Sequence, residues 1–356
     1  MVATVTDEQS AARELVRGWA RTAASGAAAT AAVRDMEYGF EEGNADAWRP
    51  VFAGLAGLGL FGVAVPEDCG GAGGSIEDLC AMVDEAARAL VPGPVATTAV
   101  ATLVVSDPKL RSALASGERF AGVAIDGGVQ VDPKTSTASG TVGRVLGGAP
   151  GGVVLLPADG NWLLVDTACD EVVVEPLRAT DFSLPLARMV LTSAPVTVLE
   201  VSGERVEDLA ATVLAAEAAG VARWTLDTAV AYAKVREQFG KPIGSFQAVK
   251  HLCAQMLCRV AAADAARAAA DSDGTQLSIA AAVAASIGID AAKANAKDCI
   301  QVLGGIGCTW EHDAHLYLRR AHGIGGFLGG SGRWLRRVTA LTQAGVRRRL
   351  GVDLAE

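Results

Sequence analysis

The pattern of hydrophobic and polar positions divides the chain into three parts. Up to about residue 105, apolar residues recur at helical spacing in segments such as SIEDLCAMVDEAARAL, separated by turn-forming segments such as AVPEDCGGAGGS. From about residue 120 to 200, the pattern changes to short β-branched runs, such as GGVVLLP and EVVVEPL, divided by Gly, Pro, Asp and Asn. From about residue 204, long helical periodicity returns. We therefore predict an α+β protein with a helical domain at 1–105, a β-domain at 106–203 and a helical domain at 204–356.

Local spacing refines this prediction. Ser75, with Asp78 three residues later, predicts the N-cap of a helix in the first part. No helices alternate with the β-branched runs, so we expect a compact antiparallel domain and not a doubly wound sheet. The last part predicts a four-helix bundle, with long helices at about 207–235 and 277–303. A further helix in it carries one apolar stripe, formed by Val249, Leu252, Cys253, Met256, Leu257 and Val260.

Composition and charge exclude several classes of protein. Half of the 356 residues are hydrophobic (51%), which is enough to bury a large core. A net charge of -9 and a pI near 5.1 argue against a surface for nucleic acid or anionic membrane. The local basic runs RWLRR (333–337) and RRR (347–349) are expected to be solvated helix ends. Charges interrupt the apolar stretches, and no apolar signal core is seen, so we predict a cytoplasmic protein with no membrane span.

The thiols and imidazoles predict no metal site. Seven cysteines are scattered along the chain without a CxxC motif, which favours buried reduced thiols over disulfides or zinc ligands. His312 and His315 have a spacing that can chelate a metal on a helix. No third ligand is evident beside them, so we predict that the chain holds no metal.

The segment AHGIGGFLGGSG, at 321–332, contains six glycines in twelve residues. A dinucleotide-binding loop requires GxGxxG directly after a strand. Here the third glycine is out of register, and the preceding residues HLYLRRA do not resemble a buried strand. This segment is therefore either a break between helices or the remainder of a catalytic segment.

Two segments indicate chemistry: VREQFGKPIGSFQAVKH (235–251) and QVLGGIGCTWEHDAHLYLRRA (301–321). Each begins at the end of a predicted long helix. Arg236 provides a fixed fork of donors beside a turn, an arrangement that suits a phosphate or a carboxylate. Gly304 and Gly305 allow the backbone to approach a ligand closely. Spacing alone favours a structural interpretation, in which both segments are turns between helices with glycine caps and a structural arginine.

These segments closely resemble the signature regions of the acyl-CoA dehydrogenase family, as does AVPEDCGGAGG, and the three-part pattern fits that family over essentially the whole chain. The resemblance implies α,β-dehydrogenation of an acyl-CoA thioester, in which a glutamate removes the α proton and FAD accepts the hydride. It also implies that FAD lies at a subunit interface and that these segments contact the FAD of the neighbouring protomer. Carried over by matching residue, the implied contacts are Arg236, Gln238, Phe239, Phe246, Gln247, Gln301, Gly304 and Gly305.

The family's catalytic groups are missing from this chain. Its glutamate matches the neighbourhood of Leu328 or, in a second arrangement, Ala210, and neither residue is an acid. Asp208 matches an acid that helps to hold coenzyme A, but its usual arginine partner is replaced by Ala211. The family's flavin-ring segment also has no counterpart between residues 106 and 142, and the β-domain at 106–203 is shortened relative to the family.

This combination resembles the shorter, base-lacking subunit of α2β2 bacterial acyl-CoA dehydrogenases that act in steroid side-chain breakdown. The resemblance implies that the chain completes the FAD site of a longer homologous subunit and is active only with that partner. The pair would pass electrons to an electron-transfer acceptor.

Two alternatives remain open. Glu217 lies about 10 Å along the helix from Ala210, within the apolar segment AAEAAG, and is a candidate base for a self-sufficient homotetramer. The interpretation that we favour is an ion pair between Glu217 and an arginine such as Arg223 or Arg259. The second alternative is a flavin-free scaffold protein of the same fold.

Overall fold

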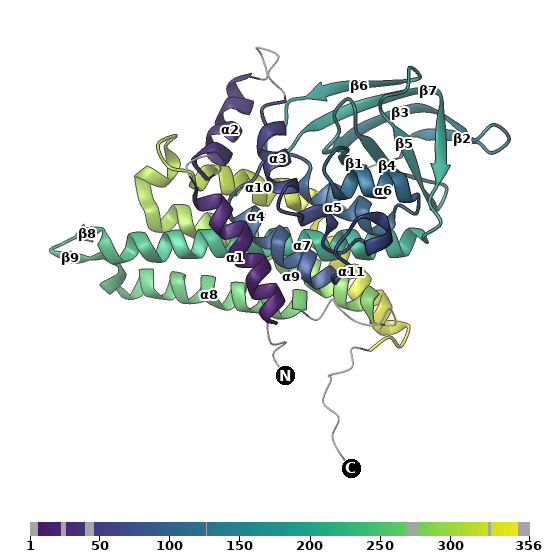
Figure 1. Ribbon diagram of the computed structural model, residues 1–356. Coiled ribbons are helices and arrows are strands. Elements are labelled where there is room, and N and C mark those ends of the chain that lie inside the picture. Colours follow the sequence, from purple (N-terminus) through teal and green to yellow (C-terminus); the bar gives the residue numbers. More distant parts are fainter. Residues whose placement is uncertain are drawn as a thin grey trace.

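Figure 1 shows the chain as a computed structural model that describes residues 6–22, 26–39, 46–125, 127–268, 276–326 and 329–347. Helices, a sheet and further helices follow one another along the chain, which confirms the predicted order. The helices of the first part are α1 (Asp7–Arg21), α2 (Gly26–Gly39), α3 (Arg49–Ala56), η1 (Leu60–Gly62), η2 (Glu67–Cys69), α4 (Ile76–Arg88), α5 (Val95–Val104) and α6 (Pro108–Ala115).

In the first part, the predicted N-cap of α4 is confirmed. The Asp78 amide donates to Ser75 Oγ at 3.1 Å, and the Ser75 amide donates to the Asp78 carboxylate at 2.9 Å. This reciprocal pair satisfies two donors at the start of the helix. Helix α6 follows the predicted boundary at residue 105, yet it packs against α5, η1 and η2 of the helical part.

The sheet contains β1 (Ala121–Ala124), β2 (Val129–Asp132), β3 (Thr137–Leu146), β4 (Val153–Ala158), β5 (Asn161–Asp166), β6 (Val172–Leu177) and β7 (Leu186–Val198). Its strand order is β2-β3-β1-β4-β5-β7-β6, and an additional β3–β7 pairing joins the two sides. Strands β1 and β4 run parallel, whereas the other pairs are antiparallel. The prediction of an antiparallel domain is therefore wrong at this pair, because the chain reverses once in the β2–β3 hairpin and again between β3 and β4.

The last part is a helical bundle, formed by α7 (Gly203–Val235), α8 (Gln247–Ala268), α9 (Leu277–Leu303), α10 (Ala314–Gly326) and α11 (Gly330–Gln343). Its connections contain β8 (Glu237–Gln238), β9 (Lys241–Pro242), η3 (Ile243–Ser245) and η4 (Gly304–Cys308). The two long helices predicted from the sequence are confirmed as α7 and α9, which pack along each other. Leu257 departs from the predicted apolar stripe of α8: its side chain is 57% exposed, because α8 packs on α7 and α9 from one side only.

Three further expectations need correction or qualification. Cys258 and Cys308 are exposed, so the prediction of buried thiols fails for these two residues. Arg333 and Arg337 are not free helix-end charges, because they contact Glu207 of α7. Helix α7 and the segment Leu277–Cys308 are apolar and long enough to cross a membrane. Their most apolar windows are 89% and 61% buried within the protein, and core helices pass the same test.

Candidate functional site

The first candidate segment forms a hairpin at the end of α7, where β8 and β9 are joined by Phe239 and Gly240. The φ angles of these two residues are 52° and 75°, so both lie in the left-handed region that a type I′ hairpin turn requires. Glycine adopts this conformation freely, whereas phenylalanine is strained in it. The Phe239 side chain is 92% exposed, so no core contact compensates for the strain. A strained and exposed aromatic residue indicates contact with another molecule.

Aromatic and cationic groups surround Phe239. The Phe246 ring meets it edge-on, with 6.0 Å between centroids, and Lys241 Nζ lies 4.6 Å from the Phe246 centroid. Arg236 is exposed at the start of the hairpin, and no carboxylate of the described residues lies within 4.0 Å of its guanidinium. Two exposed amides complete the group, Gln238 and Gln247.

The second candidate segment lies at the end of α9, at the same end of the bundle. Gln301 is exposed in the last turn of α9, and Gly304 has a φ of 66°. A Cβ placed on Gly304 or Gly305 would meet no atom within 4 Å, so this backbone is open to a ligand. The ends of α7, α8 and α9 share one apolar cluster, which contains Ala233, Val249 and Leu303. The structure therefore brings the two predicted segments to one end of the bundle (Figure 1).

This end of the bundle is remote from the sheet of the same chain (Figure 1). Gly203, at the start of α7, lies against Gly160 and Trp162 of the sheet. The hairpin follows the other end of this 33-residue helix, about 50 Å away. A ligand held against β5 therefore cannot reach Phe239. The hairpin thus lies beyond the reach of a ligand on the sheet of its own chain.

Glu217 is buried in the middle of α7 and forms an ion pair. Arg320 of α10 donates from Nη1 to Glu217 Oε1 at 2.7 Å and from Nη2 to the Val91 carbonyl at 3.0 Å. Its Nε donates to Ser183 Oγ at 2.7 Å and lies 3.1 Å from Asp181 Oδ2. The guanidinium is thus satisfied on every side by groups of α7, the α4–α5 connection and the β6–β7 connection.

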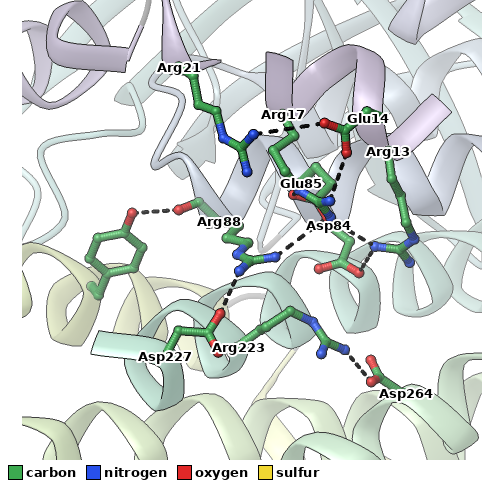
Figure 2. A network of polar contacts seen from close by, with 11 residues as sticks. Arg13, Glu14, Arg17, Arg21, Asp84, Glu85, Arg88, Arg223, Asp227 and Asp264 are labelled. Atoms are coloured by element: carbon green, nitrogen blue, oxygen red, sulfur yellow. Dashed lines mark hydrogen bonds and ion pairs between the residues drawn. The ribbon is translucent and has the colours of Figure 1, made fainter. Parts of the chain in front are cut away.

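The ion pair of Glu217 was predicted, but its partner was not. Arg223 pairs with Asp264, as Figure 2 shows, and Arg259 pairs with Asp298 at 2.6 Å. Arg223 lies six residues after Glu217 on the same helix, about 240° around its axis, and therefore faces α8. The prediction of either arginine as the partner of Glu217 is wrong.

Arg320 itself left a signal in the sequence. It belongs to an apolar stripe of α10, whose other members Leu316, Tyr317, Ala321 and Ile324 are buried. A single arginine on an apolar stripe requires a buried counter-charge. A single glutamate on the apolar face of α7 has the same requirement.

The surroundings of Glu217 leave no space for a substrate. Burial raises the pKa of its carboxyl group, and the attraction of Arg320 opposes this effect. The cavity beside Glu217 and Arg320 has a volume of only about 10 Å³, too small for an acyl group. In this arrangement the carboxylate is a structural partner of Arg320.

The other residues at family positions are also internal. Ala210 is 1% exposed in the core, and Leu328 lies outside the described residues. Asp208 is buried, accepts hydrogen bonds from Ser278 Oγ and, at 2.8 Å, from Arg337 Nη2, and has its pKa raised by burial. The arginine missing at Ala211 is thus supplied by α11. Asp208 links α7, α9 and α11 instead of facing a ligand.

The histidine pair makes hydrogen bonds with the backbone, and the described part of the glycine-rich segment ends one helix and begins the next. His312 Nδ1 accepts from the Ala314 amide at 3.1 Å, and His315 Nδ1 bonds the His312 carbonyl at 2.8 Å. Within the described ranges, no group of three or more His, Cys, Asp or Glu residues could hold a metal. The glycine-rich segment contains the end of α10 and, at Gly329 and Gly330, the left-handed turn that begins α11.

An ion-pair network fixes the first helix to this frame. Figure 2 shows Arg13 and Arg17 of α1 directed at Asp84 and Glu85 of α4, and both contacts measure 2.5 Å. The two acids are 0% and 3% exposed, so the arginines of α1 supply their counter-charges. Arg88 extends the network from α4 to Asp227 of α7, also at 2.5 Å.

Comparison with known proteins agrees with this architecture. Residues 6–112 match the family model for the N-terminal domain of acyl-CoA dehydrogenases, and residues 208–340 match the model for the C-terminal domain. The chain belongs to the acyl-CoA dehydrogenase family. Acyl-CoA dehydrogenase IpdE2 of Mycolicibacterium smegmatis is 34% identical, over 94% of this chain and 99% of its own length.

A second relative is much longer than this acyl-CoA dehydrogenase chain. Acyl-CoA dehydrogenase FadE34 of Mycobacterium tuberculosis is 99% identical over 100% of this chain, but the match covers 51% of FadE34. The chain therefore spans about half the length of that relative.

Solved structures show the same fold. A variant of the Tcur3481–Tcur3483 steroid ACAD has a TM-score of 0.85 at 27% identity, over 96% of this chain and 99% of that chain. The ChsE4–ChsE5 complex of Mycobacterium tuberculosis has a TM-score of 0.78 at 24% identity, over 96% and 99%. The second likeness shows the fold alone.

Proposed function

We propose that this chain is the base-lacking half of a flavin-dependent acyl-CoA dehydrogenase and completes the FAD site of a homologous partner unit. The position of the hairpin carries this proposal. Arg236 and Phe239 face solvent at the end of α7 that lies farthest from the sheet of their own chain. At the same time, Glu217 is held by Arg320, and Ala210 cannot act as a base.

The exposed residues fit the adenine and diphosphate parts of FAD. The Arg236 guanidinium offers a planar fork of donors to a diphosphate. Phe239 and Phe246 offer apolar ring surface to an adenine, and Gly304 and Gly305 leave their backbone open to close approach. FAD, when bound, supplies the acceptor for the hydride. The role of these residues is to bind and orient, while the proton is removed by a glutamate of the partner.

Relatives and neighbours support the type of partner and substrate. The structural neighbour described as a steroid ACAD carries a paired name, Tcur3481–Tcur3483, and ChsE4–ChsE5 is a complex. We propose a homologous partner unit and a steroid side-chain acyl-CoA as the substrate class, with an electron-transfer acceptor. The greater length of FadE34 allows the partner to be a separate chain or a second unit of one polypeptide.

The test is the flavin absorption spectrum of the chain, alone and after coexpression with the part of FadE34 that it does not match. We expect a colourless chain alone and a yellow complex. Arg236→Ala should strongly reduce the flavin content of that complex. Arg188→Ala is the matched control, because Arg188 is exposed and pairs with Glu175 within the sheet.

Two results would overturn the proposal. One is a chain that binds about one FAD when purified alone. The other is a yellow complex whose flavin content does not change in the Arg236 variant. A homotetramer that uses Glu217 as its base is disfavoured by the Arg320 ion pair and by the cavity of about 10 Å³. A flavin-free scaffold would leave the exposed, strained Phe239 without a role.

A further inference from the structure

A cationic surface continues from Gln301 along α9. Lys293 and Lys297 lie one helical turn apart, and Gln301 follows at the same spacing, so the three residues share one face of the helix. Together they span about 12 Å of α9. Lys297 and Gln301 are exposed, and Lys293 is half-buried. The proposed half-site for a dinucleotide thus runs directly into two ammonium groups.

Helix α10 adds an imidazole to this surface. It runs antiparallel to α9, since Ala314 shares a cluster with Leu303 while Gly325 lies against Ile289 and Lys293. A Cβ on Gly325 would collide with the end of the Lys293 side chain, so this glycine lets the lysine lie across α10. His322, exposed three residues before Gly325, lies on the same face of α10.

The charges of this cluster are not balanced within the described part of the chain. No carboxylate of the described residues lies within 4.0 Å of either lysine, although Asp290 precedes Lys293 by three residues on α9. Burial and the two lysines together lower the pKa of His322. Two ammonium groups and one imidazole thus lie close together without a counter-charge. A bound anion would stabilise this arrangement.

We infer that Lys293, Lys297 and His322 bind a diphosphate ester, the group that dinucleotide cofactors and coenzyme A share. This assignment deepens the proposed function and rests on it. The lysines attract the diphosphate as point charges, the imidazole donates a hydrogen bond, and Gln301 orients the attached nucleoside. The alternative is a purely structural role, in which Lys293 neutralises the partial negative charge at the end of α10.

The experiment follows the ring resonances of the four histidines by NMR in the purified chain, titrated first with inorganic pyrophosphate. We expect a saturable shift of the His322 resonance, identified with His322→Gln, and a rise in its pKa. The resonance of His251 on α8 should not move. Lys293→Gln and Lys297→Gln should each weaken pyrophosphate binding about tenfold. Lys134→Gln, in the exposed β2–β3 turn, is the matched control for the loss of one positive charge.

ADP and coenzyme A then distinguish the two sources. Tighter binding of ADP assigns the site to a dinucleotide, and tighter binding of coenzyme A assigns it to the substrate. The inference is overturned if pyrophosphate shifts no resonance saturably. It is also overturned if the lysine variants lower only the melting temperature and bind pyrophosphate as the wild type does.

The experiment needs neither partner nor flavin, so its outcome is separate from that of the proposed function. Pyrophosphate binding without flavin in the coexpressed complex would retain the anion site and reject the proposed function. A yellow complex, in a protein whose His322 resonance does not respond to pyrophosphate, would support the proposed function and reject the anion site.

Discussion

Phe239 is the residue at which conformational strain and exposure coincide. A type I′ turn prefers Asn-Gly, so Phe239→Asn should relieve the strain and raise the free energy of unfolding by about 1 kcal/mol. The same change removes the exposed ring, so the flavin content of the coexpressed complex should fall. Thermal unfolding and flavin absorbance measure the two effects separately. A variant that loses stability would show that Phe239 is part of the fold and not of a binding surface.

Glu217 should give the chain a distinct dependence of stability on pH. Its pKa is raised from 4.5 by burial, so the stability that the protonated form contributes is fully present below about pH 4.5. That contribution is lost as the pH rises through the higher pKa of the folded state. Glutamine does not ionise, so the melting temperature of Glu217→Gln relative to wild type should increase from pH 4.5 towards neutrality. Glu175→Gln, which alters an exposed ion pair, is the matched control for the loss of one carboxylate.

At the same scale, the sequence shows which residues are unusual but not which residues meet. Glu217 stands out because it is the single acid in AAEAAG, and its ion pair was expected. Its partner Arg320 is 103 residues away, on a helix that packs against both α7 and α9. Helical spacing places a residue on one face of its own helix, but it gives no distance between segments far apart in the sequence. It could therefore not identify Arg320 as the partner of Glu217.

Among the elements, α4 and α7 are held together by close backbone contact at Gly220. A Cβ on Gly220 would collide with the Asp84 carbonyl, so this glycine sets the distance between the two helices. Gly220→Ala should therefore destabilise the fold by about 1–3 kcal/mol, although alanine is the better helix former. Gly18→Ala is the matched control, since a Cβ there meets no atom within 4 Å, and it should stabilise α1 by about 0.5–1 kcal/mol. Urea unfolding of both variants measures these changes in the free energy of unfolding. A Gly220→Ala variant that is more stable than the wild type would contradict the close contact between α4 and α7.

Helix α1 is attached to α4 by ion pairs as well as by apolar packing of Val16 in the core. Arg13→Met leaves the buried Asp84 without its 2.5 Å partner and should cost about 2–3 kcal/mol. Adding Asp84→Asn removes the unpaired charge, so the double variant should recover part of that loss. Hydrogen exchange should show faster opening of α1 in the single variant than in the double variant. Equal stability of the two variants would mean that the unpaired charge of Asp84 is not the cause of the loss.

For the molecule as a whole, hydrophobic periodicity was sufficient to predict the order of helices and strands and the bounds of α9, because each long helix carries its own apolar pattern. The parallel pairing of β1 with β4 was not predictable, since strand order depends on contacts between distant segments. Similarly, Arg236 in the first segment and Gly304 and Gly305 in the second were sufficient to recognise both candidate segments in the sequence. Their position about 50 Å from the start of α7 appears only when the bundle is assembled.

This geometry predicts the flavin content of the assembled enzyme. Under the proposed function, this chain contributes the hairpin and the end of α9 to the partner's flavin site, while its own Glu217 is paired with Arg320. A complex with equal numbers of the two units should therefore bind about one FAD per pair, and not two, if the partner supplies the ring contacts and the base. Flavin released by denaturation, measured against the concentrations of both units, gives this ratio. A ratio of two would mean that the sheet of this chain holds a flavin of its own. A ratio of one that falls to near zero in Arg236→Ala, but not in Arg188→Ala, would assign the single flavin to the interface formed by the hairpin.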